Sequence, residues 1–296
     1  MTAHRSRVAA LALTLACWTG AMAVRAAEPT PSAPVGMVAQ PCPAGSFGRT
    51  DADLALAAGF FKEGPPDPGV LAAWAKEAPE RTRLEDWRKA NDWADLCRYR
   101  LDNERIARAG KVRVVFLGDS ITEFWKAADP AFFADGVVNR GISGQTSGQL
   151  LLRFQQDVVS LRPRAVHILV GTNDVAGNNG PERPEDLKNN LRAMLAIAQA
   201  NHLRVILGSI PPAATFSWRP ALRPAAQIRE INVWIAAFAK AQGAAYIDYG
   251  AVLADPDGAM KPGLSRDGVH PLKAGYALMK PLSEKAMPGP TGRPAR

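Results

Sequence analysis

Residues 112–123 read Val-Arg-Val-Val-Phe-Leu-Gly-Asp-Ser-Ile-Thr-Glu, and this stretch indicates the class of fold. Its first six residues are almost continuously apolar, as expected of a strand that is covered on both faces. A glycine and several polar residues follow at once, which is typical of a tight turn between a strand and a helix. Four further apolar runs of this kind occur later in the chain, at 137–142, 165–170, 205–210 and 245–249.

Amphipathic stretches separate the apolar runs and predict helices. They cover residues 147–161, 184–200, 224–241 and 272–285. The alternation of buried strands with helices predicts an α/β fold with a five-stranded parallel sheet and right-handed crossovers. In such sheets ligands bind beyond the carboxyl ends of the strands, so the residues that directly follow each run are the candidates for chemistry.

The composition is that of an ordinary globular protein. The 296 residues are 47% hydrophobic and 22% charged, and they include 25 glycines, 24 prolines and three cysteines. These values exclude a disordered or fibrous chain and a small disulfide-framed protein. A chain of this length is sufficient for one large core with a smaller appendage.

The first 26 residues resemble an export signal. Arg5 and Arg7 precede an apolar run that is too short to span a bilayer, and small residues follow, with cleavage after either Ala23 or Ala26. We therefore expect an exported protein, periplasmic or secreted, without stable membrane insertion. Residues 14–17 match a lipoprotein box imperfectly, because threonine stands where leucine is usual, so lipid attachment is the less favoured alternative.

The net charge of +8 comes from 36 lysines and arginines against 28 aspartates and glutamates. Three of the arginines lie in the predicted export signal, which leaves about +5 in the rest of the chain. That charge is scattered, so the sequence predicts an ordinary solvated surface and no nucleic-acid partner. Nothing in the sequence indicates an oligomeric state.

Residues 27–50 predict a linker, since they are rich in proline, alanine and glycine and show no apolar periodicity. Cys42 lies in this segment, and Cys97 lies in the region beyond it. In an oxidising compartment a disulfide between them would close a loop of about 56 residues, a constraint worth about 4 kcal/mol. The alternative is two unpaired thiols, and the sequence leaves both open.

Residues 51–110 predict a helical N-terminal extension. It contains a short helix at 70–78 and a longer one at 80–109 that ends at Gly110. Apolar residues recur in the longer helix at mostly helical spacing, and we expect them to form a buried stripe that docks the extension. The stripe consists of Trp87, Trp93, Leu96, Leu101 and Ile106. The alternative is that one of the two tryptophans reaches the functional site.

Three of the apolar runs end in residues that suit acyl transfer. Ser120 follows the first run, Gly141 lies near the end of the second, and Asn173 follows the third. A serine in such a turn can act as a nucleophile beside backbone N–H groups that stabilise an oxyanion, to which Gly141 and Asn173 would each add a donor. Taken alone, each also has a structural interpretation. Ser120 with Glu123 matches a helix capping box, Gly141 suits an ordinary turn, and Asn173 suits an Asx turn.

His270 is the candidate general base. It follows the fifth apolar run and a loop, and Asp267 precedes it by three residues, close enough for a carboxylate to orient the imidazole. The other histidines fit this role less well. His4 lies in the predicted export signal, His202 begins the turn before a strand, and His167 lies within a strand, where a buried histidine with a satisfied hydrogen bond is expected.

These segments, in this order, resemble the blocks of the SGNH/GDSL hydrolase superfamily. The nucleophile block is similar to Gly118-Asp119-Ser120, the glycine block to Gly141, the asparagine block to Gly171–Asp174, and the Asp-x-x-His block to Asp267–His270. One block alone is a weak signal, but four in order over about 170 residues form a specific one. The resemblance covers residues 111–287 and leaves 288–296 as a flexible tail.

The resemblance implies a three-layer flavodoxin-like fold and hydrolysis of esters through an acyl-enzyme, with no metal or organic cofactor. Ser120 would be the nucleophile, His270 the base and Asp267 its orienting acid. The N–H groups of Ser120 and Gly141, with the side chain of Asn173, would form the oxyanion hole. The sequence contains no Gly-x-Ser-x-Gly elbow, no phosphate-binding glycine-lysine loop and no His-Glu-x-x-His zinc motif.

The loop after the fourth run is the candidate substrate contact. Trp218 could stack on a sugar ring, and Arg219 could bind hydroxyls or a carboxylate. The alternative is that Trp218 packs beneath its loop. Segments 141–146 and 218–220 resemble those of exported acetylesterase-like family members, which favours an O-acetyl ester on a carbohydrate as substrate. The alternatives are a lysophospholipase or thioesterase, or a glycan-binding protein without catalytic activity.

Overall fold

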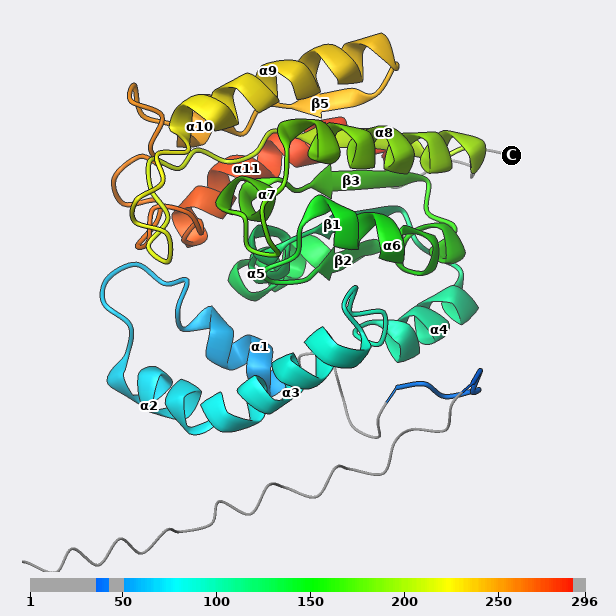
Figure 1. Ribbon diagram of the computed structural model, residues 1–296, viewed down its shortest axis with the longest axis horizontal. Helices are drawn as coiled ribbons and strands as arrows, with labels where there is room; N and C mark the ends of the chain where they lie inside the picture. Colours follow the sequence, from blue (N-terminus) through cyan, green and yellow to red (C-terminus); the bar gives the residue numbers. More distant parts are fainter. Residues whose placement is uncertain (1–35, 43–50, 290–296) are drawn as a thin grey trace, which may run out of the picture. The chain divides into compact units, whose positions relative to one another are not determined.

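The computed structural model describes residues 36–42 and 51–289 (Figure 1). The chain divides into two units, Met1–Pro41 and Cys42–Arg296, and every helix and strand named below belongs to the second. The predicted export signal lies outside the described residues, and so do most of the predicted linker and tail. Residues 36–42 contain no helix or strand. In the described part of the chain, no helix combines the length and the apolar character needed to cross a membrane.

Five parallel strands form one sheet in the order β2-β1-β3-β4-β5, which confirms the expected α/β fold. The strands are β1 (Val114–Gly118), β2 (Val137–Gly141), β3 (Ala165–Leu169), β4 (Arg204–Gly208) and β5 (Ala245–Ile247). This order is flavodoxin-like, and its topological switch point lies between β1 and β3. Gly118 at the end of β1 pairs with Gly141 of β2 and Leu169 of β3, so the residues after these strands emerge at one edge.

Helices cover both faces of the sheet and complete three layers (Figure 1). One face packs against α6 (Ser147–Asp157), α8 (Pro184–Ala200) and α9 (Ala225–Ala241). The other packs against α5 (Ser120–Ala128), α10 (Gly250–Leu253) and α11 (Lys273–Ala286). Successive strand residues face opposite layers. Val115 and Leu117 of β1 therefore join the first cluster, while Val114 and Phe116 join the second.

The predicted elements of the sheet region differ from the structure mainly at their ends. The helix predicted at 184–200 is α8 with the same bounds. The one predicted at 147–161 divides into α6 and a 3₁₀ turn, η2 (Val159–Leu161). Three short elements were not predicted, the 3₁₀ helix η1 (Pro130–Phe133), α7 (Thr172–Ala176) and α10.

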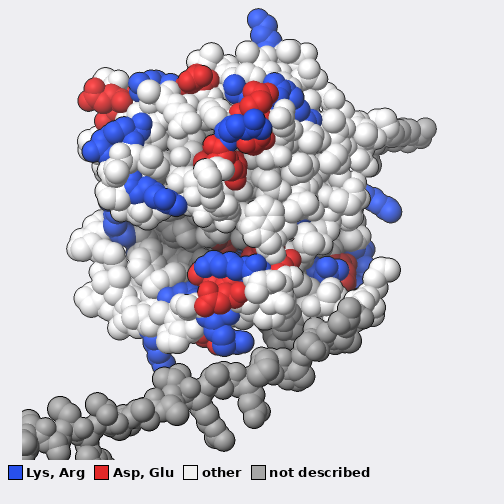
Figure 2. Space-filling model, viewed as in Figure 1, with Lys and Arg blue, Asp and Glu red and all other residues white. Residues whose placement is uncertain are grey.

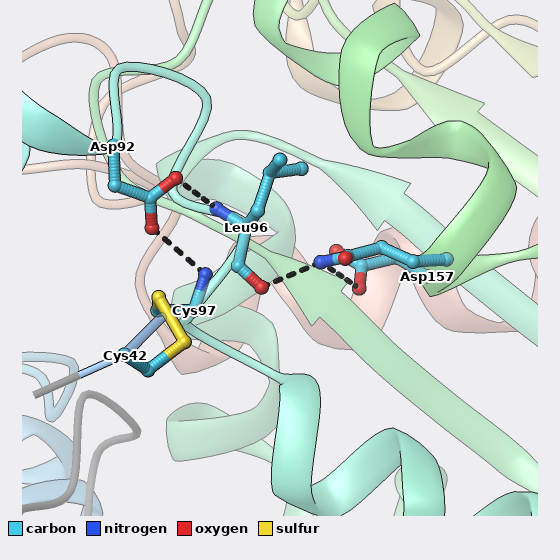
Figure 3. Close-up of a disulfide and its surroundings, with 6 residues drawn as sticks. Cys42, Asp92, Leu96, Cys97 and Asp157 are labelled. Carbon is cyan, nitrogen blue, oxygen red and sulfur yellow. Dashed lines mark hydrogen bonds between the residues drawn. A yellow bond between two sulfur atoms is a disulfide. The ribbon is translucent and has the colours of Figure 1, made fainter. Parts of the chain in front are cut away.

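The N-terminal extension is helical, but its longer predicted helix is wrong. The extension contains α1 (Asp51–Ala58), α2 (Pro68–Lys76), α3 (Ala78–Asn91) and α4 (Arg100–Ala109). The break between α3 and α4 is made by Asp92, whose carboxylate accepts the backbone N–H groups of Leu96 and Cys97 at 2.8 Å each (Figure 3). These bonds offer the backbone an alternative to the helix. Gly110 ends α4 in a left-handed conformation with φ 66°, as predicted.

The predicted apolar stripe of the extension does not form. Trp93 is 48% exposed and Leu101 is 68% exposed, so neither docks the extension through a buried face. Polar groups make the attachment instead. The guanidinium of Arg98 bonds Glu123 at 2.5 Å, and the hydroxyl of Tyr99 donates to the carbonyl oxygen of Gly141 at 2.5 Å. Apolar packing attaches the start of the extension, because Ala57 and Phe61 are buried in the cluster that contains Trp125, whereas α4 and the segment before it are held largely by hydrogen bonds and ion pairs.

Cys42 and Cys97 form a disulfide (Figure 3). Their Cα atoms lie 5.6 Å apart, and the bond joins residues separated by 55 positions. The alternative of two unpaired thiols is therefore wrong. Gln156 of α6 donates to the carbonyl oxygen of Leu96 at 2.6 Å, which ties the cysteine-bearing segment to the helix layer beside it.

Charged side chains of both signs mix on the face drawn in Figure 2. Lysine and arginine atoms lie beside aspartate and glutamate atoms, and neither sign forms a continuous patch on that face. This distribution is typical of a solvated surface.

Candidate active site

Ser120 begins α5 directly beyond the end of β1. Asp119 is the N-cap of this helix, because its Oδ1 accepts the N–H of Ile121 at 2.9 Å. The turn requires glycine at 118, where a Cβ would lie 2.0 Å from Oγ1 of Thr122 and 2.7 Å from the carbonyl oxygen of Leu169. The capping-box interpretation of Ser120 is therefore wrong. Its side chain points instead to His270, with 2.8 Å between Oγ and Nε2.

Asp267 holds His270 through a compact local turn. Oδ1 of Asp267 accepts the backbone N–H groups of Val269 at 2.9 Å and His270 at 2.8 Å. Its Oδ2 lies 2.6 Å from Nδ1 of His270. Partial burial raises the pKa of Asp267, but the hydrogen bonds and charge of His270 outweigh it, and the pKa lies well below its ordinary value. An ionised carboxylate thus fixes one ring nitrogen and leaves the other for Ser120.

The carboxyl group of Asp119, the residue before Ser120, has a different environment from that of Asp267. Complete burial raises the pKa of Asp119 to about 7, against the opposing effects of the Ile121 hydrogen bond and the charge of His270. Oδ2 of Asp119 lies 3.4 Å from Nδ2 of Asn173. Asp119 therefore changes its charge near neutral pH next to the nucleophile candidate.

Asn173 lies at the same edge and directs its amide nitrogen toward the turn after β2. Its Nδ2 donates to the carbonyl oxygen of Gln145 at 2.9 Å, and the side chain is buried. Gln145 follows Gly144 in that turn. The amide has two N–H groups, and the second is directed at Oδ2 of Asp119, 3.4 Å from Nδ2.

The backbone N–H of Gly141, a predicted oxyanion donor, already makes a hydrogen bond within the protein. It donates to Oδ1 of Asn139 at 2.9 Å, and Gly141 lies so close to α5 that a Cβ would be 2.1 Å from the backbone nitrogen of Glu123. Gly141 thus serves close packing. Gly144 is exposed, has φ +80° and, within the described residues, donates no backbone hydrogen bond. Gly144 is the second glycine of Gly-Ile-Ser-Gly, and that glycine was the sequence signal for a backbone N–H that is open to a ligand.

Glu123 supports the turn that carries Gly144. Its Oε2 accepts the backbone N–H of Ser143 at 2.9 Å and also accepts the hydroxyl of Ser143. Its Oε1 accepts the guanidinium of Arg98 from the extension. Sequence reasoning missed this role because the partners lie 25 and 20 positions away in the chain.

Buried polar contacts also support the site from below. Arg153 of α6 is fully buried and donates to the carbonyl oxygen of Gly118 at 2.9 Å. It is paired with Asp157 at 2.9 Å. The carboxylate of Asp174 accepts the N–H and hydroxyl groups of Ser147, and burial raises its pKa. Burial and then the charge of Asp174 raise the pKa of Glu182 to about 7.

Trp218 lies beside His270, whereas Arg219 bonds its own surroundings. The Trp218 and His270 rings are 6.3 Å apart, and Trp218 is 39% exposed and stacks on Phe216 at 5.2 Å. The guanidinium of Arg219 donates to the carbonyl oxygen of Gly177 at 3.2 Å. Phe124, which sequence reasoning missed, lies 5.4 Å from the His270 ring. Its position four residues after Ser120, one turn along the helix, was the available signal.

His167 is not part of this site. It is fully buried in β3, stacks on Phe116 at 4.4 Å, and shares a hydrogen bond with the hydroxyl of Tyr249 at 2.8 Å. Burial lowers the pKa of His167 to about 3, so the ring is neutral. This confirms the prediction of a core histidine.

A family model described as "GDSL-like Lipase/Acylhydrolase family" matches residues 116–278, more than half of the chain. The chain belongs to this family. As a GDSL-like acylhydrolase it is a hydrolase of carboxylic ester bonds. The matched residues run from β1 into α11, so they include Ser120, Asn173 and His270.

Two solved structures share the family and the fold. A GDSL-like lipase from Bacteroides thetaiotaomicron is 41% identical, with a TM-score of 0.63 over 66% of this chain and 98% of that one. A Bacteroides fragilis protein assigned to the acylhydrolases is 39% identical, with a TM-score of 0.63 over 66% of this chain and 96% of that one.

An acetylxylan esterase from Geobacillus stearothermophilus is 33% identical over 21% of this chain. The match spans 40% of the length of that esterase. Across the described part of this acylhydrolase, no group of three or more histidine, cysteine, aspartate or glutamate side chains is placed to hold a metal ion.

Proposed function

We propose that this acylhydrolase is an exported serine esterase that removes O-acetyl groups from a carbohydrate. The observation that carries the chemistry is the continuous chain from Ser120 Oγ to His270 Nε2 at 2.8 Å and from His270 Nδ1 to Asp267 Oδ2 at 2.6 Å. Each distance allows proton transfer or a strong hydrogen bond. Export is proposed from the signal-like residues 1–26.

The reaction proceeds in two steps on one serine. Oγ of Ser120 attacks the ester carbonyl while Nε2 of His270 takes the hydroxyl proton, and the tetrahedral intermediate expels the sugar alcohol, which receives that proton. Water then loses a proton to His270 and attacks the acetyl-enzyme. The bond to Ser120 breaks, the serine regains its proton, and acetate leaves. Asp267 remains ionised throughout and stabilises the imidazolium, which agrees with its lowered pKa.

Three N–H donors are available to the oxyanion in this proposal. The N–H of Ser120 has no acceptor within its own helix, because it is the first residue of α5. The second donor is the N–H of Gly144, which replaces Gly141 because Asn139 already occupies the N–H of Gly141. The third is the side-chain amide of Asn173, whose N–H toward Asp119 makes only a long contact of 3.4 Å and would donate to the oxyanion instead. Preorganised donors of this kind supply much of the rate enhancement of acyl transfer.

The substrate class is supported by the aromatic surface beside His270 and by the curated relative. The Trp218 indole is partly exposed at the site, and an indole face suits the apolar face of a sugar ring. The acetylxylan esterase relative acts on an acetylated polysaccharide by its name, although the match spans only 40% of its length. Lysophospholipase or thioesterase action is the alternative within the same chemistry.

Covalent labelling tests the nucleophile. A fluorophosphonate should label the mature protein, and Ser120→Ala should abolish both labelling and hydrolysis of p-nitrophenyl acetate. Ser160→Ala is the matched control, because this exposed serine bonds only the carbonyl oxygen of Gln155 in its own surroundings. Labelling that survives Ser120→Ala, or a wild-type protein with neither labelling nor turnover, would overturn the proposal and favour a glycan-binding protein without catalytic activity.

Release of product from defined substrates tests the substrate class. We expect acetate release from acetylated xylan, pectin or peptidoglycan to exceed fatty-acid release from lysophospholipid at equal enzyme concentration. Trp218→Ala should raise KM for the acetylated glycan more than for ethyl acetate, because ethyl acetate offers no ring to stack on the indole. Faster release of fatty acid would instead assign the enzyme to the lipid substrates.

A further inference from the structure

Three side chains connect the Trp218 loop to the oxyanion side of the site. The indole Nε1 of Trp218 lies 2.9 Å from Oδ1 of Asn178. Nδ2 of Asn178 lies 2.5 Å from Oδ1 of Asn173. Nδ2 of Asn173 lies 2.9 Å from the carbonyl oxygen of Gln145. This series of hydrogen bonds, called the amide chain below, thus begins at an exposed aromatic ring and ends in the turn that carries Gly144.

The direction of this chain is fixed at both of its ends. An indole nitrogen can only donate, so the atom of Asn178 that faces Trp218 must be its oxygen. Its amide nitrogen must then face Asn173, which has to present its oxygen in return. At the other end, the carbonyl oxygen of Gln145 can only accept, so it also requires the nitrogen of Asn173. Every hydrogen bond in the chain agrees with a single orientation of both amides.

We propose that Asn178 is a positioning residue that, together with the indole N–H of Trp218, holds the Asn173 amide with one N–H group toward Gln145 and the other toward Asp119, the residue before the nucleophile candidate. The proposal rests on the esterase function proposed above. With the amide reversed, Asn173 would present its carbonyl oxygen to the developing oxyanion and repel it. The donor to Gln145 would be lost as well. Trp218 would then contribute to turnover of every ester, including esters that have no sugar ring.

Asn178 is suited to this role by its position at the end of a short helix. It follows the left-handed residue Gly177, which ends α7, and its backbone N–H donates to the carbonyl oxygen of Asn173 at 3.0 Å. Backbone and side chain therefore both attach Asn178 to Asn173. The half-buried Asn178 amide is placed between a buried donor candidate and a ring that is 39% exposed.

Several charged groups lie near the amide chain, so a test must separate their effects on activity from the effect of these hydrogen bonds. Asp119 faces Asn173, and Asp174 with its neighbour Glu182 adjoins the same helix. His270 faces Trp218, and Arg219 bonds the carbonyl oxygen of Gly177. All of these groups are present in the wild-type enzyme too. The informative quantity is therefore the ratio of variant to wild-type kcat at each pH.

Asn178→Asp tests which groups donate and which accept in the amide chain. An ionised carboxylate can still accept from Trp218, but it cannot donate to Oδ1 of Asn173, whereas the protonated acid can. We expect kcat for p-nitrophenyl acetate to fall about 10- to 100-fold at pH 8, part of the 100- to 1,000-fold effect of a complete oxyanion donor. The ratio to wild type should rise as the pH falls to 5. KM should change less than about threefold.

Asn179→Asp is the matched control. It introduces the same charge one residue later, on an exposed side chain that donates to Oε1 of Gln149 instead of Asn173. Its ratio to wild type should stay flat across the pH range. Equal pH profiles for the two variants, or an effect of Asn178→Asp on KM alone, would show that charge or substrate binding explains the result and would overturn the proposal.

Trp218→Phe provides a second route if Asn178→Asp fails to fold, as judged by circular dichroism. It keeps an aromatic ring and removes only the donor, so kcat for p-nitrophenyl acetate should fall about tenfold with KM nearly unchanged. Unchanged kcat would overturn the proposal. If wild-type turnover proves independent of Ser120, the proposed esterase function fails and this proposal with it. A Ser120-dependent wild type with unaffected variants refutes the positioning role alone.

Discussion

The part of the extension from α2 to α4 and the sheet region are held in place by different forces. The sheet is covered on both faces by continuous apolar clusters whose members include Leu117, Phe154 and Trp125. In the extension, α1 and the turn after it bury Ala57 and Phe61 in the cluster around Trp125, but α2 and α3 contain no buried residue and α4 buries only Asn103. Asn103 is itself polar and bonds Asp157 at 2.6 Å and Arg140 at 2.8 Å.

This difference affects how each region depends on individual residues. Apolar burial is distributed over many side chains, and each contributes in proportion to the area it removes from water. A polar attachment depends on a few groups that must keep their partners, because a buried polar atom without one is costly. The extension also touches the site through such groups, since Arg98 bonds Glu123 and Tyr99 bonds the carbonyl oxygen of Gly141.

The largest effect is expected from truncating the aromatic core of the sheet region. Trp125 is fully buried and packs against Phe132 at 5.1 Å and Tyr276 at 5.3 Å. Trp125→Ala should lower the free energy of unfolding by about 5 kcal/mol, the upper end for such substitutions, because rigid rings surround the cavity. Urea unfolding followed by circular dichroism measures this loss.

Trp125→Phe is the control for that substitution. It keeps a ring in the same place and also removes an indole nitrogen that is buried without a hydrogen-bond partner, so its cost should be clearly smaller. Equal losses for both variants would show that the aromatic cluster does not stabilise the sheet region through packing.

The next effect concerns the disulfide that attaches Cys42 to the extension. The Cys42–Cys97 bond spans 55 positions and lies N-terminal to the first strand. Replacing both cysteines by serine should cost about 4 kcal/mol of chain-entropy stabilisation, all of it in the extension. Hydrogen exchange should become faster at residues 92–99 and stay unchanged in β1 and β3. Equal acceleration in the strands would show that both regions unfold as one unit.

The sheet region could be predicted from the sequence because its signals are local and redundant. Most buried strands are apolar runs with few interruptions, and the long helices carry their own periodicity, so an error at one end does not alter the topology. The candidate site follows from that topology, since Ser120, Asn173 and His270 all lie beyond strand ends. The bonds from Ser120 to His270 and from His270 to Asp267 agree with that expectation.

The part of the extension from α2 to α4 could not be predicted in the same way because the contacts that hold it are largely long-range and polar. A stripe of apolar residues predicted its docking face, but Asp92 breaks the helix and leaves Trp93 exposed. No local pattern indicates that Arg98 meets Glu123. The same limit explains why Asn178 was missed at the site, since its side chain connects residues 5 and 40 positions away.

Removal of a buried charge should have the third-largest effect. The side chains of Arg98 and Glu123 are only 10% and 6% exposed, so water screens their pairing little. Arg98→Met keeps the length of the side chain and leaves the buried carboxylate without this cation, which should cost about 3 kcal/mol. Esterase kcat should fall as well, because Glu123 also holds the N–H of Ser143 next to Gly144. Denaturant titration and p-nitrophenyl acetate turnover measure the two effects.

The smallest effect should come from a similar ion pair in the same extension that water surrounds. Arg83 and Glu80 lie 2.6 Å apart on α3, about as close as Arg98 and Glu123, but their side chains are 67% and 60% exposed. Solvent competes for both groups, so Arg83→Met should leave the unfolding midpoint and the turnover unchanged within error. The pair makes the same kind of contact at nearly the same distance, and only burial differs. If Arg83→Met were as damaging as Arg98→Met, distance alone would decide the strength of these ion pairs, and the contrast between the two regions would have to be explained without burial.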